Sequence, residues 1–211
     1  MSVDDQAGLR IRELRIAQGM TLVELGETAG LPVSTLSKLE NNKMSLSYDK
    51  LVKIAVGLDV EVGQLLSGAS TARAAAPSLG RRCLTPRDEG PRIETADYIY
   101  RYLANDLLNK RMTPMIMDIK SADTGQIEMS RHPGEEFIMV TEGRVRVVTE
   151  LYAPMILGAG DTMYFDAGMG HAYLKEGEEP ARLLSISSAS AEELAAVRAP
   201  ALPSLNGGEQ G

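Results

Sequence analysis

The sequence predicts a multidomain α+β protein in which an all-α domain precedes an all-β domain. Up to Leu66 the apolar residues recur at helical spacing, as in Leu22, Leu25 and Ala29. From about Asp97 the pattern changes to short β-type runs separated by turn signals, which is typical of a sandwich or barrel. We therefore expect domains at 1–66 and 97–190, a linker at 67–96, and a short helix with a flexible tail at 191–211.

The length, charge and cysteine content of the chain exclude several classes of protein. The chain has 211 residues, a net charge of −7 and a single cysteine, Cys83, which excludes an intramolecular disulfide. No apolar run approaches the ~20 residues of a membrane span, and the first residues do not resemble a signal peptide. The negative charge argues against a non-specific polyanion binder. A cytoplasmic protein is expected.

Residues 21–43 have the spacing of capping, turn and apolar residues that is typical of a helix-turn-helix. Thr21 and Glu24 form a capping box that starts one helix, Gly30 is placed to end it, and Pro32 is tolerated at the start of the next. On this second helix the leucines face the core. Its other residues project outward, where they can enter the major groove of DNA: Val33, Ser34, Ser37 and Lys38.

The stretch from Leu9 to Leu66 resembles the XRE type of helix-turn-helix domain, a five-helix lambda-repressor-like fold. The matching segments are LRIRELR, MTLVELGETAGL, STLSKLENNK and YDKLVKIAVGLDV. The sequence departs from the family at Leu22, where glutamine is frequent, and at Pro32, where a capping Ser or Thr is usual. The resemblance implies base-edge contacts from Val33, Ser34 and Lys38 with Ser37 nearby, and phosphate contacts from Thr35, Asn41 and Lys43.

The net charge of the predicted helix-turn-helix domain gives little support to DNA binding. Residues 1–66 hold seven basic against nine acidic side chains, so a monomer should bind DNA weakly. We expect a homodimer on paired half-sites of double-stranded operator DNA. The alternative is a helical bundle that docks another protein.

In the β half, the only two histidines of the chain lie beside glycine turns. His132 and Glu136 would be ~13 Å apart on an extended strand, but Pro133-Gly134 is a turn-forming pair that can fold them together. His171 follows the glycine-rich turn at 166–170. Two imidazoles and one carboxylate are a metal set suited to Zn, Fe, Ni or Mn. The alternative is that both histidines are structural.

This half resembles a cupin, a double-stranded β-helix or jelly roll, over roughly residues 110–188. One motif runs from Gly125 to Gly143 and the other from Gly160 to His171. The resemblance implies metal ligands at His132, Glu136 and His171. Ser130 stands where the family has its first histidine, which makes it a candidate but poor fourth ligand. Asp166 replaces the usual proline.

The methionines and the basic residues of the β half each allow two interpretations. Eight of the eleven methionines fall in this half, where they could line an adaptable pocket or fill a core. Some basic residues could meet an acidic effector or belong to a solvated face: Arg101, Lys110, Arg111 and Arg131.

Together the halves resemble the XRE–cupin class of bacterial transcriptional regulators, which implies that the second domain senses a small molecule of unknown identity and contributes to dimerisation. On this reading the protein is not an enzyme and has no catalytic residues. Two alternatives stand beside it: a metal-dependent cupin oxygenase or isomerase, and a metal-free cupin that only dimerises.

Overall fold

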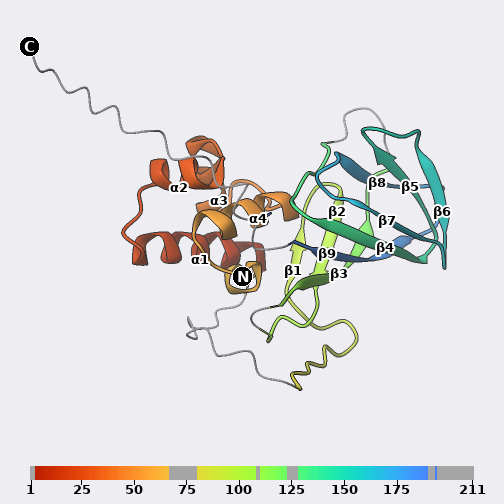
Figure 1. The fold of residues 1–211 in the computed structure, drawn as a ribbon, viewed down its shortest axis with the longest axis horizontal. Coiled ribbons are helices and arrows are strands. Elements are labelled where there is room, and N and C mark those ends of the chain that lie inside the picture. Colours follow the sequence, from red (N-terminus) through yellow and green to blue (C-terminus); the bar gives the residue numbers. More distant parts are fainter. Residues whose placement is uncertain (1–2, 67–79, 108–109, 123–127, 190–192, 194–211) are drawn as a thin grey trace, which may run out of the picture.

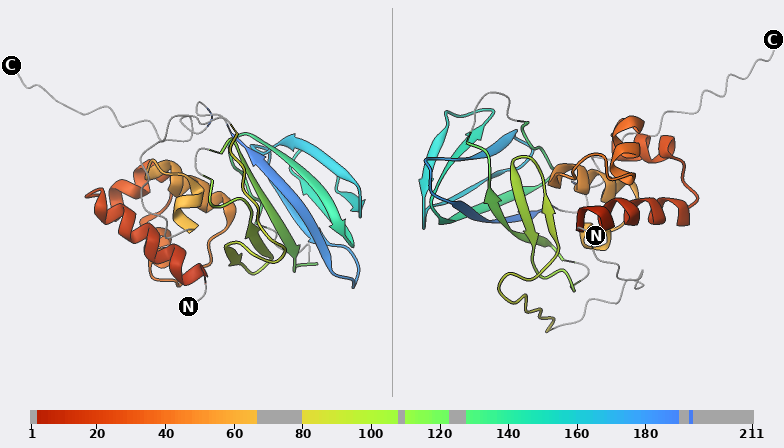
Figure 2. Two further views of the ribbon diagram at one scale, coloured as in Figure 1. Left: turned by 90° about the horizontal axis from the view of Figure 1, so that it is seen from below. Right: turned by 180° about the vertical axis from the view of Figure 1, so that it is seen from behind.

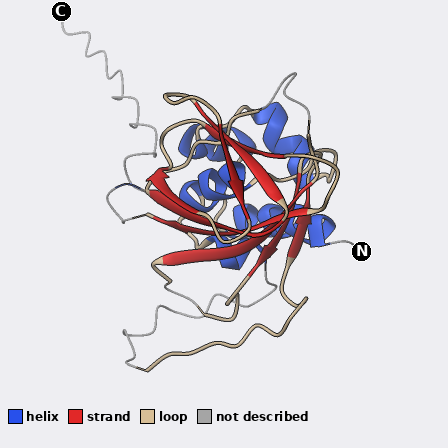
Figure 3. Ribbon diagram, turned by 90° about the vertical axis from the view of Figure 1, so that its right-hand side faces the viewer, coloured by secondary structure: helices blue, strands red, loops and turns tan. Residues whose placement is uncertain are grey.

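A computed structural model describes residues 3–66, 80–107, 110–122, 128–189 and 193. The helices gather on one side of the molecule and the strands on the other (Figure 1). The further views show the same separation, and seen from the side of the strands the sheets lie in front of the helices (Figures 2 and 3). The expected order of an α domain before a β domain is confirmed.

The N-terminal domain has the five helices expected. They are α1 (Val3–Ala17), α2 (Leu22–Ala29), α3 (Val33–Glu40), α4 (Tyr48–Gly57) and α5 (Val62–Leu66). Their core consists of side chains with no exposed surface, because the apolar positions of each helix face inward: Ile11, Leu25, Leu36, Leu51, Ile54, Leu58 and Leu65.

The turn between α2 and α3 is built as the sequence predicts. The Thr21 hydroxyl accepts a hydrogen bond from the Glu24 backbone amide, and the Glu24 carboxylate accepts one from the Thr21 amide, which completes the capping box. Gly30 ends α2 at φ 63°, in the left-handed region that glycine enters without steric cost. Pro32 precedes α3 and provides no side-chain cap.

One ion pair joins α1 to the end of α3. The Arg15 guanidinium donates from Nε to Glu40 Oε1 at 2.6 Å and from Nη2 to Glu40 Oε2 at 2.8 Å. Glu40 is only 4% exposed, so this fork-shaped pairing compensates the burial of its charge. Arg15 also donates to the Met20 carbonyl, which fixes the chain between α1 and α2.

The C-terminal domain consists of two antiparallel sheets. The larger has the order β1-β2-β3-β9-β4-β7 and the smaller the order β6-β5-β8. The strands are β1 (Arg92–Glu94), β2 (Tyr98–Tyr102), β3 (Met112–Ile119), β4 (Glu135–Glu142), β5 (Arg144–Thr149), β6 (Met155–Gly158), β7 (Thr162–Asp166), β8 (His171–Lys175) and β9 (Ala181–Ser188).

Most of these strands alternate between buried and more exposed residues, so one row of each faces the interior between the sheets. On β4 the inward row is Glu136, Ile138 and Val140. The methionines of the β domain do not share one environment. Met115 and Met117 are buried on β3, whereas Met112 and Met155 are more than half exposed.

The structure differs from the expected organisation in one respect and leaves two expectations untested. The segment expected as a linker, 67–96, contains strand β1, which pairs with β2 and so belongs to the sheet. Three residues are too short a run to stand out in the sequence. The start of the first cupin motif, at Gly125, and most of the segment expected as a short helix with a flexible tail, 191–211, lie outside the described residues.

The two domains touch through α4 and α1. Tyr48, at the start of α4, packs against Tyr102 and His132 of the β domain, and Lys50 Nζ lies 3.3 Å from Glu128 Oε1. Among the described residues, no helix is long and apolar enough to cross a membrane.

Candidate functional site

The residues expected to meet DNA lie on α3 and directly after it. Val33, Ser34 and Lys38 are exposed, while Leu36 and Leu39 are buried against the other helices. Thr35 and Ser37 are half-buried, and Asn41 and Lys43 are exposed. Asn41 closes the helix by donating from Nδ2 to the Ser37 carbonyl at 2.7 Å. The outward face of α3 is therefore free of the domain core, as a recognition helix requires.

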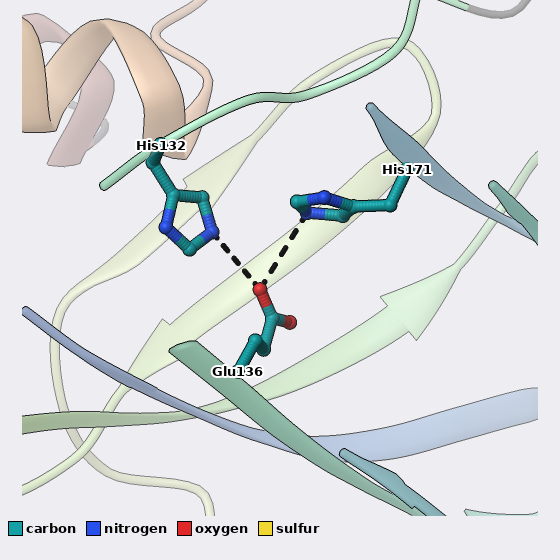
Figure 4. Close-up of side chains that lie close together, drawn as sticks. All are labelled: His132, Glu136 and His171. Atoms are coloured by element: carbon teal, nitrogen blue, oxygen red, sulfur yellow. Dashed lines mark hydrogen bonds and ion pairs between the residues drawn. The ribbon is translucent and has the colours of Figure 1, made fainter. Parts of the chain in front are cut away.

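The three expected metal ligands meet inside the β domain (Figure 4). His132 Nε2 lies 2.9 Å and His171 Nε2 3.5 Å from the same carboxylate oxygen, Glu136 Oε2. One ligand atom from each residue falls within 4.8 Å of the other two. All three side chains are buried, with exposures of 5% or less.

Local turns produce this convergence. Gly134 follows His132 and Pro133 at φ 86°, and a Cβ at this position would overlap the Ser188 carbonyl oxygen, so only glycine fits. The chain then enters β4 with Glu136 on the inward row. The His132 amide donates to the Ala167 carbonyl, which holds this segment against the turn that leads to His171.

Ser130, the candidate fourth ligand, lies beside His171. The backbone of each residue donates a hydrogen bond to the other, at 2.9 and 3.1 Å. Ser130 lines the same small cavity as the triad. Ser130 is therefore close to the triad, but the group of possible metal-ligand atoms found among the described residues consists of His132, Glu136 and His171.

Hydrogen bonds orient both imidazoles toward Glu136. His171 Nδ1 donates to the Met169 carbonyl at 2.9 Å, and His132 Nδ1 donates to the Pro133 carbonyl at 3.3 Å. A carbonyl only accepts, so Nδ1 is a donor in both rings and each Nε2 faces Glu136 Oε2. At His132 the Nε2–Oε2 distance of 2.9 Å is that of a hydrogen bond when Nε2 carries a proton, and a metal ion can take the place of that proton. The donor set fits a divalent metal.

The free oxygen of Glu136 is also satisfied. Its Oε1 accepts hydrogen bonds from the Tyr173 hydroxyl and the Ser185 hydroxyl, both at 2.7 Å. Burial raises the pKa of Glu136, but the hydrogen bond and charge of His132, together with His171 and Tyr173, outweigh burial and lower the pKa overall. Burial lowers the pKa of His171. The site thus favours an ionised carboxylate and a neutral imidazole, the forms that bind metal.

Aromatic side chains fill the space around the triad. The cavity there measures only about 20 Å³, and it is lined by Tyr48, Tyr98, Tyr100 and Tyr173 together with Met115 and Met117. One water needs about 10–15 Å³ on this scale, so the cavity has room for a metal ion or a water but not for an organic molecule.

Tyr48 brings the helical domain to this site. Its ring meets the His132 ring edge to face, with centroids 4.9 Å apart. Burial raises the pKa of its hydroxyl to about 12, while the nearby Ser187 and Thr113 hydroxyls act in the opposite direction. The start of α4 therefore packs against the His-Glu-His site.

Sequence reasoning missed three residues around the triad: Tyr173, Ser185 and Tyr48. Ser185 carried no signal, because the buried row of β9 is Ala181, Leu183, Ser185 and Ser187, and the local pattern of apolar residues does not predict that row. Tyr173 and Tyr48 carried none, since an aromatic residue reads as ordinary core.

The four basic residues considered as effector contacts fall into two groups. Arg131 forms a two-pronged ion pair with Glu150, and Arg101 pairs with Asp88. These two belong to the surface. Lys110 and Arg111 instead line a cavity between the domains. Glu135, the neighbour of Glu136, is exposed and does not join the triad.

Comparison with known families agrees with this geometry. A family model described as helix-turn-helix, of the HTH_3 type, matches residues 11–65, and a model described as cupin domain matches residues 117–187. The chain joins an XRE-type helix-turn-helix domain to a C-terminal cupin domain. This domain pair fits a DNA-binding regulator with a cupin sensor.

One solved structure is similar to this chain over both domains. An HTH_3 family transcriptional regulator from Vibrio cholerae matches with a TM-score of 0.60 and 17% identity, over 90% of this chain and 98% of that one. This likeness shows the fold across both domains. Hydroxypropylphosphonic acid epoxidase from S. wedmorenis has a TM-score of 0.46 and 21% identity, over 87% of this chain and 97% of that one. No curated protein matches the sequence.

Proposed function

We propose that the protein is a transcriptional regulator that binds operator DNA through α3 and senses a small molecule through its cupin domain. The observation that carries the proposal is the fused domain pair, with an exposed recognition face at one end and a buried His-Glu-His site at the other. Residues 1–66 would bind DNA, and residues 97–190 together with β1 would respond to the signal. Such a protein works where the chromosome is, in the cytoplasm.

We assign base-edge contacts to Val33, Ser34 and Lys38, and phosphate contacts to Thr35, Asn41 and Lys43. Ser37 lies between the two sets on α3. Hydroxyl and ammonium groups donate to base edges in the major groove, and each good contact discriminates by ~1–3 kcal/mol.

The experiment is to select the preferred operator from random duplexes, map binding sites across the genome, and measure the affinity of variants. Ser34→Ala and Lys38→Ala should each weaken operator binding by ~1–3 kcal/mol, with a smaller effect on unrelated DNA. Lys120→Ala, on the far domain and paired with Glu94, is the matched control and should change nothing. Variants that bind the operator like the wild type would show that α3 does not read the bases.

For the cupin domain we propose a divalent metal held by His132, Glu136 and His171, with Ser130 or a water completing its shell. Zn, Fe, Ni or Mn would each suit two imidazoles and a carboxylate. The metal would supply positive charge that fixes the triad and, through His132, the ring of Tyr48. Metal analysis of the purified protein and titration of the metal-free protein test this directly. Absence of binding by all four metals would favour a cupin that serves only for dimerisation.

A metal-dependent oxygenase or isomerase is the second candidate. Two histidines and one carboxylate have the composition of the triad in non-haem iron enzymes. The 20 Å³ cavity opposes this function, because a substrate would have to displace several buried tyrosines before it reached a metal. Turnover assays with iron and oxygen distinguish the two functions.

A further inference from the structure

A second cavity lies between the two domains and is much larger than the one at the triad. It measures about 150 Å³ and opens beside α4 and α5. A cavity of about this volume holds a benzene molecule in an engineered protein. The space between the domains can therefore take a ligand of about six to ten heavy atoms, which the metal site cannot.

The two walls of this cavity differ in chemistry. The helical domain contributes apolar side chains, among them Val52, Val56, Val60 and Val62. The cupin domain contributes the hydroxyl-bearing residues Thr113, Ser187 and Ser188. Ser187 is 3% exposed, and its hydroxyl lies near the Tyr48 hydroxyl but forms no hydrogen bond of normal geometry among the described residues. A buried hydroxyl of this kind is stabilised when a polar ligand supplies a partner.

Charge favours an anion. Lys110 and Arg111 line the cavity, and Glu61 is the carboxylate that faces them. Lys110 is half-buried and uses one of its three donors on the Ala104 carbonyl, at 2.9 Å. The lining of the cavity holds two cations against one carboxylate, which leaves it a net positive charge next to an apolar wall, while Asp106 lies outside the lining near Lys110. That combination suits a carboxylate attached to a compact apolar body.

We infer that the interdomain cavity is a binding site for a small aromatic or branched aliphatic monocarboxylate, with its apolar part against α4–α5 and its carboxylate near Lys110. The ligand bridges the DNA-binding domain and the cupin domain, so it stabilises one orientation of the two. It also contacts Tyr48 and His132, which line both this cavity and the metal site. The effect of the ligand on regulation depends on the function proposed above, whereas the binding of the ligand does not.

The test uses the full chain with benzoate as the probe, benzamide as a neutral isostere and benzylamine as a cation of similar size. Binding is measured by calorimetry and by saturation-transfer NMR. Benzoate should bind at millimolar concentrations or below. Benzamide and benzylamine should bind about tenfold more weakly, because neither gives a charged acceptor to Lys110.

Two variants locate the site. Val60→Phe places an aromatic ring in the cavity and should reduce benzoate binding by about tenfold or more. Lys110→Gln should weaken benzoate about tenfold and leave benzamide unchanged, whereas Lys120→Gln is the remote control. If Val60→Phe loses its helical circular dichroism, Lys110→Gln decides alone.

The inference is overturned if benzoate does not bind, if Lys110→Gln binds it as the wild type does, or if benzylamine binds more tightly. A parallel assay keeps the two proposals apart. Operator affinity without any probe tests the regulator function, and its failure leaves the calorimetric result standing. Failure of benzoate binding in turn leaves operator binding untouched.

Discussion

Tyr48 meets His132 edge to face, with ring centroids 4.9 Å apart and planes at 88°. The tyrosine begins a helix of the DNA-binding domain, and the histidine belongs to the proposed metal site. The proposed metal on His132 Nε2 would fix that ring and thereby the surface on which Tyr48 packs. This contact joins the buried triad of the cupin domain directly to the helical domain.

Removing the Tyr48 ring should uncouple the two domains. We expect operator affinity of the wild type to change between metal-free and metal-loaded protein by ~5–150-fold, the usual range of coupling free energies. In Tyr48→Ala this ratio should fall close to one, while metal affinity stays largely intact. Fluorescence anisotropy with labelled operator, with and without metal, measures the ratio. Tyr164→Ala, an exposed tyrosine on β7, is the control. An unchanged ratio in Tyr48→Ala would remove this coupling route.

Replacing His171 should abolish metal binding and spare DNA binding. His171→Ala or His132→Ala leaves two ligands for a metal ion, while the residues assigned to DNA lie in the other domain. Tyr173→Phe is an informative companion, because it keeps all three ligands and removes one donor to Glu136 Oε1. Loss of such an outer partner should weaken metal binding about 10–100-fold. Equilibrium dialysis measures all three, and a His171→Ala variant that retains metal would show that the histidines are structural.

Acidification should destabilise the metal-free protein. Burial lowers the pKa of His171 in the folded chain, and the pKa of Glu136 is lowered mainly because its interactions with His132 outweigh burial. Both groups therefore bind fewer protons folded than unfolded, so the free energy of unfolding rises with pH. For His171 the stabilisation is complete above the ordinary pKa of ~6.5 and is lost as pH falls through the folded value. For Glu136 the corresponding loss occurs below its ordinary pKa.

Thermal unfolding between pH 7.5 and 4.5 tests the direction of this pH dependence. The midpoint should fall as pH decreases, and His171→Ala should flatten the part of the curve just below pH ~6.5. Protons also compete with metal for the same nitrogens, so bound metal should be lost in the acid part of this range. A midpoint that stays constant or rises on acidification would contradict the assignment.

The sequence predicted those features that local patterns determine. The capping box of Thr21 and Glu24, the left-handed Gly30 and the turn that joins His132 to Glu136 all depend on residues within a few positions of one another. The short β-type runs that begin at about Asp97 form strands in the structure for the same reason. Leu22, a departure from the family pattern, is explained by the structure, because it packs against the helical core.

Contacts between distant residues could not be predicted in this way. Tyr48 reaches His132, Arg15 reaches Glu40, and Tyr173 reaches Glu136, each across 25 or more positions. Nothing in the local sequence distinguishes these residues from other aromatic or charged ones. The interdomain cavity depends on how two separately folded domains pack, which local patterns do not encode.

The Arg15–Glu40 pair should be important for the stability of the helical domain. Glu40→Ala leaves a guanidinium without its carboxylate in a site where Arg15 is only 12% exposed. Breaking a buried pair on one side costs about 3–5 kcal/mol. Glu13→Ala, which breaks the surface pair with Arg10, should cost less than about 1 kcal/mol. Urea unfolding measures both, and equal effects would show that burial does not strengthen the pair.

Paired half-sites should explain how an acidic DNA-binding domain reaches useful affinity. Residues 1–66 carry seven basic and nine acidic side chains, and Arg15 is occupied by Glu40. Few cations remain to neutralise phosphates, so we expect a homodimer on a pseudo-palindrome with half-sites about 10 bp apart, or a multiple of that. Light scattering gives the mass of the free protein, and footprinting gives the spacing.

Salt dependence counts the protomers on the DNA independently of both measurements. Each phosphate contact contributes about 0.9 to the slope of log affinity against log salt concentration. Lys43→Ala removes one assigned contact per protomer, so the slope should fall by ~1.8 for a dimer and by ~0.9 for a monomer. Lys120→Ala, on the β domain, should leave the slope unchanged. A change of ~0.9 together with a single protected half-site would mean that one protomer binds alone, whereas no change would remove Lys43 from the phosphate contacts.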